Sequence, residues 1–336
     1  MARGALVAFA VLAFVGFSAG AALGTPGGIG PPNTATPEGD TINEIYWVVF
    51  AICAVVFVLV EAALVLFIVR FRRRPTVPEH AEGPQIHGNT RLEIIWTIIP
   101  ALILAAIAVY VFVRTPAVQA TADSGDQELV IRVEAHQFYW QYEYENGAIS
   151  LDTLRIPVDT PVVLEITSLD VDHSWWVREL TGKKDAIPGQ TNELRFTAEE
   201  EGTYDGWCAE HCGIQHTVMS TTVEVVGDAE FQRWVAGKAT TRASEQLGEE
   251  TWVAACAKCH GLEGEGDVGP PIAGNGTLLN RFALRQLVVY DGQDTPNLDG
   301  YMPPVGRGWV SVQLDSLIAY IRSNQTLREG PADGSP

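Results

Sequence analysis

Basic side chains are scarce in this sequence: 22 Lys and Arg stand against 41 Asp and Glu, which gives a formal net charge of −19 at pH 7. Proteins that bind nucleic acid neutralise its phosphates with Lys and Arg, so this balance argues against a nucleic-acid partner. The charge would suit a basic protein partner, and an acidic surface that is simply solvated explains it as well. Internal repeats are also absent.

Sulfur is scarce too. The Cys are Cys53, Cys208, Cys212, Cys256 and Cys259, and the Met are Met1, Met219 and Met302. Four of the Cys fall in two short motifs, and each motif has one Met within it or downstream of it. Cys53 lies alone in an apolar run, which is typical of an inert buried thiol. No disulfide framework is therefore needed.

The run from Cys208 to Met219, CAEHCGIQHTVM, combines two thiols, two imidazoles and a thioether. Soft sulfur with imidazole favours copper in an electron-transfer site, and a weak Met ligand commonly completes such a site. A mononuclear site needs one Cys, so two closely spaced Cys indicate thiolates that bridge two metal ions. His173 offers a further imidazole upstream. Zinc and a disulfide are alternatives, but zinc has no use for the Met and a disulfide leaves His216 unexplained.

This run, together with the upstream DHSWW of residues 172–176, resembles the CuA loop of cytochrome c oxidase subunit II, C-x-E-x-C-G-x-x-H-x-x-M. The resemblance implies a binuclear copper centre. The implied ligands are the bridging thiolates of Cys208 and Cys212, the imidazoles of His173 and His216, the thioether of Met219 and the backbone carbonyl of Glu210. The Glu210 carboxylate would turn toward a Mg²⁺ ion at the boundary with subunit I. His211 is unusual for the family, and we interpret it as lying outside a ligand set that is already complete.

A second redox motif, CAKCH, covers residues 256–260. C-x-x-C-H is the signature of covalent c-type haem attachment, in which Cys256 and Cys259 form thioethers and His260 binds the iron. C-x-x-C alone would also fit zinc or a redox dithiol, and the His narrows the choice. Met302 is the candidate for the other axial ligand, as in the class I cytochromes c that this region resembles; a purely packed side chain is the alternative. The GPP of residues 269–271 resembles the loop that supports the haem-binding His in that family.

The N-terminal region predicts export and a linker. Residues 1–24 contain Arg3, an apolar run and then small residues, which is the pattern of a secretory signal peptide cleaved near Ala21 or Ala22. A third, uncleaved membrane helix is the alternative. Residues 25–40 are rich in Gly, Pro and Thr and predict a mobile linker.

Residues 41–114 predict a transmembrane helix hairpin, with spans over about 45–69 and 94–113 that are long enough to cross a bilayer. Five Arg lie between the spans, whereas residues 25–44 contain no Lys or Arg. The positive-inside rule therefore puts the connection in the cytoplasm. We expect a bacterial-type plasma-membrane protein with two spans, whose copper and haem domains lie on the outer face. The run RLEIIWTIIP of residues 91–100 resembles the segment at which the second helix of subunit II begins. The resemblance implies that Glu93 lies near the mouth of a proton channel in subunit I. A solvated residue at a helix end is the alternative.

The rest of the chain predicts two domains outside the membrane. Apolar and polar residues alternate over 128–134, 161–167 and 219–226, which indicates strands, and short strands between turns favour a Greek-key sandwich. The predicted segments are a cupredoxin CuA domain over 125–227, a connector over 228–244, a cytochrome c domain over 245–326 with a helix over 312–324, and a tail over 327–336. The expected fold is a membrane two-helix hairpin, an all-β Greek-key cupredoxin sandwich and a small all-α cytochrome c domain.

In combination these features resemble subunit II of a caa-type haem–copper oxidase, with a cytochrome c fused at its C-terminus. The resemblance implies that electrons from an upstream donor, such as a cytochrome bc complex or a small cytochrome, pass through haem c and CuA to subunit I. Oxygen reduction and proton pumping would take place there, and the implied partners are subunit I, the other oxidase subunits and the membrane.

Two alternatives remain open from sequence: the electron-input subunit of a CuA-type nitric oxide reductase, and a free-standing membrane-anchored electron carrier. A quinol oxidase subunit is disfavoured, because such subunits usually lack the copper ligands found here. Phe138 stands where oxidases fed by soluble cytochrome c commonly have Trp. Either drift between aromatics or a relaxed need for Trp beside a tethered haem explains it.

Overall fold

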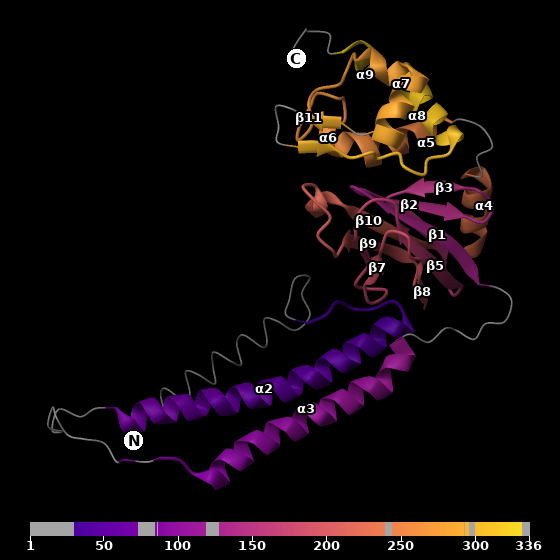
Figure 1. Cartoon of the computed structure of the whole chain (residues 1–336). Helices are drawn as coiled ribbons and strands as arrows, with labels where there is room; N and C mark the ends of the chain where they lie inside the picture. The colour runs from indigo at the N-terminus through magenta and orange to yellow at the C-terminus, as the bar shows by residue number, and fades with distance from the viewer. Residues whose placement is uncertain are drawn as a thin grey trace. The chain divides into compact units, whose positions relative to one another are not determined.

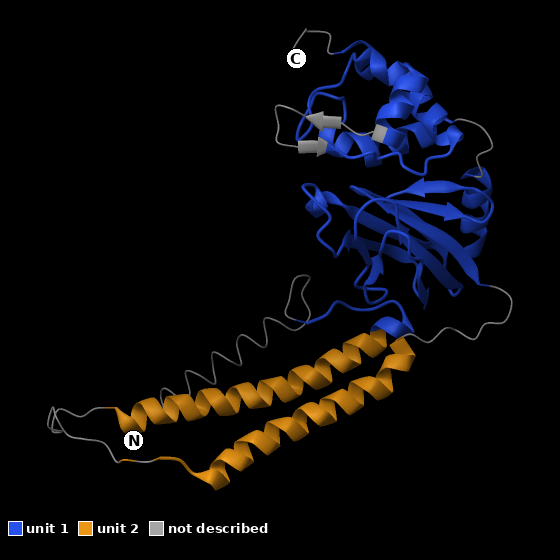
Figure 2. Cartoon of the chain, viewed as in Figure 1, with its two compact units in different colours: residues 1–39, 120–336 blue, residues 40–119 orange. Residues whose placement is uncertain are grey.

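The chain divides into two units, residues 40–119 and residues 1–39 with 120–336 (Figure 2). A computed structural model describes residues 30–72, 85, 87–118, 128–238, 244–291, 293–295 and 300–330. The predicted signal peptide over residues 1–24 lies outside the described residues.

Two long helices, α2 Pro37–Phe71 and α3 Thr90–Val118, account for the described part of the unit of residues 40–119, apart from its short connecting residues (Figure 1). Both are long and apolar enough to cross a membrane by length and composition. They contain the two predicted spans. Arg114 near the end of α3 forms an ion pair with Glu44 near the start of α2, which joins the helices at this end.

Side-chain caps fix where these helices begin. The Thr36 hydroxyl accepts a hydrogen bond from the backbone N–H of Gly39 at 2.9 Å at the start of α2. At the start of α3, Asn89 Oδ1 accepts from the N–H of Leu92 at 3.2 Å, while Glu93 Oε1 accepts from the N–H of Asn89 at 3.1 Å. This reciprocal arrangement is a form of capping box. Glu93 therefore acts at a helix end in this structure.

Strands β1 to β10 form a sandwich of two five-stranded sheets, in the orders β3-β2-β1-β5-β8 and β4-β10-β9-β6-β7. The strands are β1 Leu129–His136, β2 Tyr139–Tyr144, β3 Ile149–Leu151, β4 Thr153–Pro157, β5 Pro161–Ser168, β6 His173–Trp176, β7 Lys184–Ala186, β8 Asn192–Thr197, β9 Gly202–Cys208 and β10 Ser220–Val226. β1 pairs in parallel with β5 and β10 with β4, and the other neighbours are antiparallel. The three strands predicted from alternation correspond to β1, β5 and β10.

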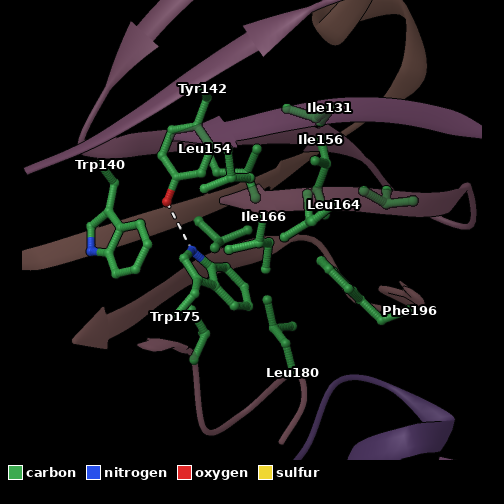
Figure 3. Packing of buried hydrophobic residues seen from close by; sticks show 14 of the residues in the cluster. Ile131, Trp140, Tyr142, Leu154, Ile156, Leu164, Ile166, Trp175, Leu180 and Phe196 are labelled. Carbon is green, nitrogen blue, oxygen red and sulfur yellow. Dashed lines mark hydrogen bonds between the residues drawn. The ribbon is translucent and has the colours of Figure 1, made fainter. Parts of the chain in front are cut away.

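Alternate side chains of the strands fill the space between the two sheets (Figure 3). On β1, Ile131 and Val133 are fully buried, whereas Arg132 between them is exposed. The indole N–H of Trp175 on β6 donates to the hydroxyl of Tyr142 on β2 at 2.9 Å, so the buried aromatics of opposite sheets are also hydrogen-bonded. The sandwich is thus a firm scaffold for the loops at its end.

The segment before α2 is bound to the sandwich. Ala35 donates to the carbonyl of Glu179 at 2.9 Å and accepts from the N–H of Glu199 at 2.9 Å. Thr36 is buried beside it. This differs from the mobile linker predicted over residues 25–40, because backbone pairing with two loops holds the part of it just before α2.

Residues 244–330 form a mainly helical domain after helix α4 Asp228–Lys238. Its elements are α5 Glu245–Thr251, η2 Trp252–Ala257, α6 Lys258–His260, η3 Gly276–Leu279, α7 Arg281–Arg285, η4 Gln286–Asp291, β11 Gln293–Thr295, β12 Gly300–Met302, α8 Ser311–Ser323 and α9 Gln325–Glu329. Helices α5 and α8 cross closely at Gly248, where a Cβ atom would lie 2.0 Å from the carbonyl oxygen of Ser316. Only glycine allows this approach.

This domain is helical as predicted, and β11 and β12 add a small antiparallel sheet whose last residue is Met302. The end of the domain differs from the prediction. The predicted tail over residues 327–336 begins inside α9, and Leu327 is buried in the domain core. Asn324 Oδ1 caps α9 by accepting from the backbone N–H of Leu327 at 3.1 Å, and burial of the Leu327 side chain extends the folded domain beyond residue 326.

Candidate metal centres

The end of the sandwich where β6 begins and β9 ends brings the predicted copper ligands together. His173 is the first residue of β6 and Cys208 the last of β9, and these two strands are neighbours, with Trp175 opposite Cys208. The chain then loops through Cys212 and His216 to Met219, directly before β10. Register within one sheet therefore places ligands that are 35 residues apart in sequence side by side.

Six candidate ligand groups converge in two sets, one around each thiol. Cys208 Sγ lies 3.2 Å from the carbonyl oxygen of Glu210 and 3.8 Å from His173 Nδ1. Cys212 Sγ lies 3.6 Å from His216 Nδ1 and 3.8 Å from Met219 Sδ. The two sulfurs are 3.9 Å apart, and both cysteines are free. Thiol, imidazole, thioether and carbonyl donors in this combination would suit copper better than a tetrahedral zinc site.

The two thiols titrate as a pair. The pKa of Cys208 is lowered to about 3, because Cys212 donates a hydrogen bond to its thiolate and His173 adds a second, against the effect of burial. The pKa of Cys212 is raised, because its proton is held by Cys208 and because burial disfavours a second negative charge. The lowered pKa of Cys208 therefore favours one thiolate, and a metal ion bound here would favour the second.

Asp170 orients the His173 ring. Its Oδ1 lies 2.8 Å from His173 Nε2, while Oδ2 accepts from the backbone N–H of Gln137 at 2.6 Å. Burial acts to lower the pKa of His173, but the hydrogen bonds with Asp170 and Cys208 outweigh it and raise that pKa. A carboxylate on the outer nitrogen of a ligating His fixes which ring nitrogen faces the metal, and here that is Nδ1. Sequence reasoning missed Asp170, although a carboxylate three residues before a candidate ligand was a usable signal.

Other residues at the copper loop have different surroundings. Gln137 Nε2 donates to the carbonyl of Cys212 at 2.6 Å and so supports the loop from β1 and β2, a contact that the sequence pattern did not reveal. Glu210 has an exposed side chain. His211 is also exposed, with its ring 5.5 Å from that of His216. His211 therefore lies outside the two sets of candidate ligands, and its exclusion from the ligand set stays a prediction.

The C-x-x-C-H segment has the features that a covalent haem requires. Cys256 and Cys259 are free, and His260 is buried with Nδ1 2.7 Å from the carbonyl oxygen of Pro270. That bond leaves Nε2 as the nitrogen for iron. A Cβ atom at Gly269 would lie 2.7 Å from the His260 ring, so the loop closes on the imidazole only because this residue is glycine. The loop predicted to support the His is therefore in contact with it.

Met302 lies at the end of β12 and packs against the same core cluster as Cys256. Burial raises the pKa of the Cys256 thiol to about 12, with the nearby Cys259 adding to the effect. Burial likewise raises the pKa of Cys259. The residues present thus fit a c-type haem held by two thioethers, with His260 and Met302 as the candidate axial ligands.

Fold and sites define a class: a protein with two apolar helices, a cupredoxin-like sandwich carrying a Cys, His and Met cluster, and a helical domain with a haem-attachment motif. The sequence matches the family profiles described as cytochrome c oxidase subunit II, transmembrane domain, over residues 24–113, and periplasmic domain, over residues 149–226. Residues 243–321 match the profile of cytochrome c oxidase, cbb3-type, subunit III.

Curated relatives agree. Cytochrome c oxidase subunit 2 of Alkalihalophilus pseudofirmus is 32% identical over 308 residues, covering 85% of this chain and 88% of the relative. The Bacillus subtilis subunit 2 is 30% identical, covering 70% and 73%. Among solved structures, the periplasmic domain of subunit II of cytochrome oxidase from Bradyrhizobium japonicum is 30% identical and covers 34% of this chain and 94% of that domain, with a TM-score of 0.33.

The chain belongs to the cytochrome c oxidase subunit II family, and it carries a cytochrome c domain at its C-terminus. It is a subunit of a haem–copper oxidase, and the two helices with a periplasmic-type domain make it a membrane protein with an outer-face domain.

Proposed function

We propose that this chain is the electron-input subunit of its oxidase, in which electrons pass from an upstream donor to a covalent haem c, then to a binuclear CuA centre, and on to subunit I. The observation that carries the proposal is the convergence of four further ligand groups around two thiols only 3.9 Å apart. Two thiolates with two imidazoles, a thioether and a carbonyl form a donor set suited to paired copper ions.

Each group would be held by named residues of this chain. The copper pair would be held by Cys208, Cys212, His173, His216, Met219 and the carbonyl of Glu210, and the haem by Cys256, Cys259, His260 and Met302. When bound, these groups supply one-electron redox chemistry. The protein's part is to keep the ligands still. Strands β6 and β9 fix His173 and Cys208. Hydrogen bonds with Asp170 and with the carbonyl of Pro270 orient the imidazoles of His173 and His260, which leaves Nδ1 of His173 and Nε2 of His260 for the metal.

The site also suggests its partners. We propose that subunit I accepts the electrons, that the exposed Glu210 carboxylate contributes to a Mg²⁺ site at that boundary, and that the donor is a cytochrome bc complex or a small cytochrome. Both redox domains would lie on the outer face of a bacterial-type plasma membrane. The distribution of Arg around the two helices supports this orientation.

The decisive experiment is to purify the full chain with the membrane complex it assembles into and to assay consumption of oxygen and of nitric oxide separately. We expect oxygen consumption that is coupled to oxidation of both the haem and the copper centre. Nitric oxide consumption without oxygen consumption would favour the nitric oxide reductase alternative. Purification of the chain alone, with copper and haem but without a catalytic partner, would favour the free-standing carrier.

A further inference from the structure

Direct hydrogen bonds join the copper loop and its sandwich to the haem-attachment segment. The side-chain amide of Gln215 donates to the backbone carbonyl of Lys258 at 2.8 Å. Lys258 lies between the two haem cysteines in sequence. Its ammonium group donates to the carbonyl of Phe138 at 2.9 Å and pairs with Asp152 Oδ2 at 2.5 Å.

Further hydrogen bonds hold the two domains in one orientation. The hydroxyl of Tyr139, on β2, donates to the carbonyl of Val305 at 2.6 Å and accepts from the indole N–H of Trp309 at 2.8 Å. The amide of Gln313 donates to Gln141 Oε1 at 2.9 Å, also in buried surroundings. Buried polar contacts of this kind are directional, so they fix how the two surfaces meet.

The hydrogen bond of Gln215 differs from these other contacts in the two segments that it joins. It sits in the copper loop between the predicted ligands Cys212 and His216, and it is buried, with only 7% of its surface exposed. Its amide reaches the carbonyl of the residue that directly precedes Cys259. The covalent route from His216 to Cys259 is therefore interrupted by a single hydrogen bond.

We propose that Gln215 is a positioning residue that couples the haem-attachment segment to the copper loop and so sets the rate of electron transfer between them. The inference rests on the proposed function. Electronic coupling weakens less through covalent and hydrogen bonds than across empty space. A residue that replaces a gap with one hydrogen bond therefore favours electron transfer. The hydrogen bonds of the Lys258 ammonium group with Asp152 and the Phe138 carbonyl hold Lys258, and with it the backbone carbonyl that accepts from Gln215.

The test compares three variants of the full chain in its complex. Gln215→Glu keeps the length of the side chain but removes the donating amide, and Gln215→Leu removes all polarity. The matched control is Gln313→Leu, which breaks a hydrogen bond between the same two domains away from the haem motif. The measurement is the rate of copper reduction after rapid photoreduction of the haem. Copper electron paramagnetic resonance and the haem reduction potential are recorded for each variant.

We expect Gln215→Glu and Gln215→Leu to slow the transfer several-fold while the copper spectrum and the haem potential stay unchanged, and we expect Gln313→Leu to transfer at close to the original rate. Zero-length carbodiimide crosslinking of Lys258 to Asp152, mapped by mass spectrometry, should remain in all three variants because docking persists. That readout does not depend on metal or haem activity.

Two outcomes would overturn the inference alone: Gln215 variants that transfer at the original rate, or a Gln313 variant that slows as much as they do, which would mean that docking in general is what matters. Failure of the unmutated protein to pass electrons from haem to copper is a different result. It would overturn the proposed function itself, and the role of Gln215 with it.

Discussion

At the scale of single residues, the copper cluster depends on groups that come from four places in the chain. The two thiols and three of the other candidate ligands lie in one loop, but His173 arrives from β6 and Asp170 from the turn before it. The motif spacing predicted the loop ligands, because they are local in sequence. Asp170 and Gln137 were not predicted, because their roles depend on β-sheet register and on the β1–β2 turn rather than on spacing.

The first prediction concerns a bridging thiol. Cys212→Ser should abolish the two-copper centre, because a serine hydroxyl cannot replace a thiolate shared by two copper ions. Electron paramagnetic resonance of the oxidised, copper-loaded protein should show hyperfine structure from one electron shared over two copper nuclei before the mutation and none afterwards. Cys53→Ser, in α2, is the matched control and should leave the spectrum unchanged. A spectrum of isolated cupric ions in the unmutated protein would contradict the binuclear assignment.

The second prediction concerns the haem. Met302→His should leave the haem covalently attached through Cys256 and Cys259 but lower its reduction potential, because a thioether ligand raises the potential of haem iron. Redox titration measures the potential. The sulfur-to-iron absorption band should also disappear, because the substitution removes the thioether. Met302 would be excluded as a ligand by an unchanged potential together with a persistent band.

At the scale of elements, β2 serves two surfaces. Both β1 and β2 fill the sandwich core with residues such as Val133 and Trp140, and on β2 the opposite face, with Tyr139, packs against the helical domain. His136 ends β1 at this second surface, fully buried and stacked on the Tyr139 ring at 4.6 Å. Period-two alternation predicted β1, but it could not say that His136, at the end of the strand, is covered.

The third prediction follows from His136. Burial lowers the pKa of His136 to about 4 from its ordinary 6.5; nearby His173 and Arg307 act in the same direction, and Asp170 opposes them. The folded protein therefore holds a neutral His136 where the unfolded chain binds a proton. Its contribution to stability is present above about pH 6.5 and is lost as the pH falls toward 4. The full loss amounts to about 3 kcal/mol, since each pKa unit corresponds to about 1.4 kcal/mol.

Denaturant unfolding of the protein and of His136→Gln between pH 7 and 4 measures this effect. The difference in unfolding free energy between the two should shrink as the pH falls. Glu134, whose carboxylate lies 3.9 Å from His136 Nε2, has a pKa that burial raises, so it acts in the opposite direction in both proteins. Comparison of the two therefore isolates His136. Parallel curves across this range would show that His136 is not held neutral.

At the scale of the whole molecule, sequence predicted the kinds of domain well and their contacts poorly. The helix pair, the sandwich and the haem-type domain each have a strong local signature, such as long apolar runs, alternation or C-x-x-C-H. The contacts between the sandwich and the helical domain depend on single side chains such as Lys258 and Gln215, which belong to no motif position. The segment before α2 is similar: its order comes from hydrogen bonds to distant loops, not from its Gly- and Pro-rich composition.

These contacts between domains also bear on Phe138, the position at which the resemblance to subunit II leads us to expect Trp. Its side chain is 5% exposed. The ring packs closely against Gly213, where an added Cβ atom would lie 3.2 Å from two of the ring carbons. Its carbonyl accepts from Lys258 of the haem segment. A soluble donor therefore has little access to Phe138 in the full chain. This burial is compatible both with a relaxed need for Trp and with drift between two aromatics that pack equally well.

The last prediction is that soluble cytochrome c reduces the copper centre only by way of the fused haem domain. In stopped-flow mixing with reduced soluble cytochrome c, the haem of the full chain should be reduced before the copper. Met302→His, which lowers the haem potential, should slow reduction of the haem by the donor, and copper reduction should slow with it because no second route bypasses the docked domain. Adding Phe138→Trp to that variant should not restore copper reduction, since the position is covered by the contacts of Lys258 and by Gly213. Copper reduction at the original rate in Met302→His would show that a soluble donor reaches the copper loop directly, and that the fused domain is one route among others.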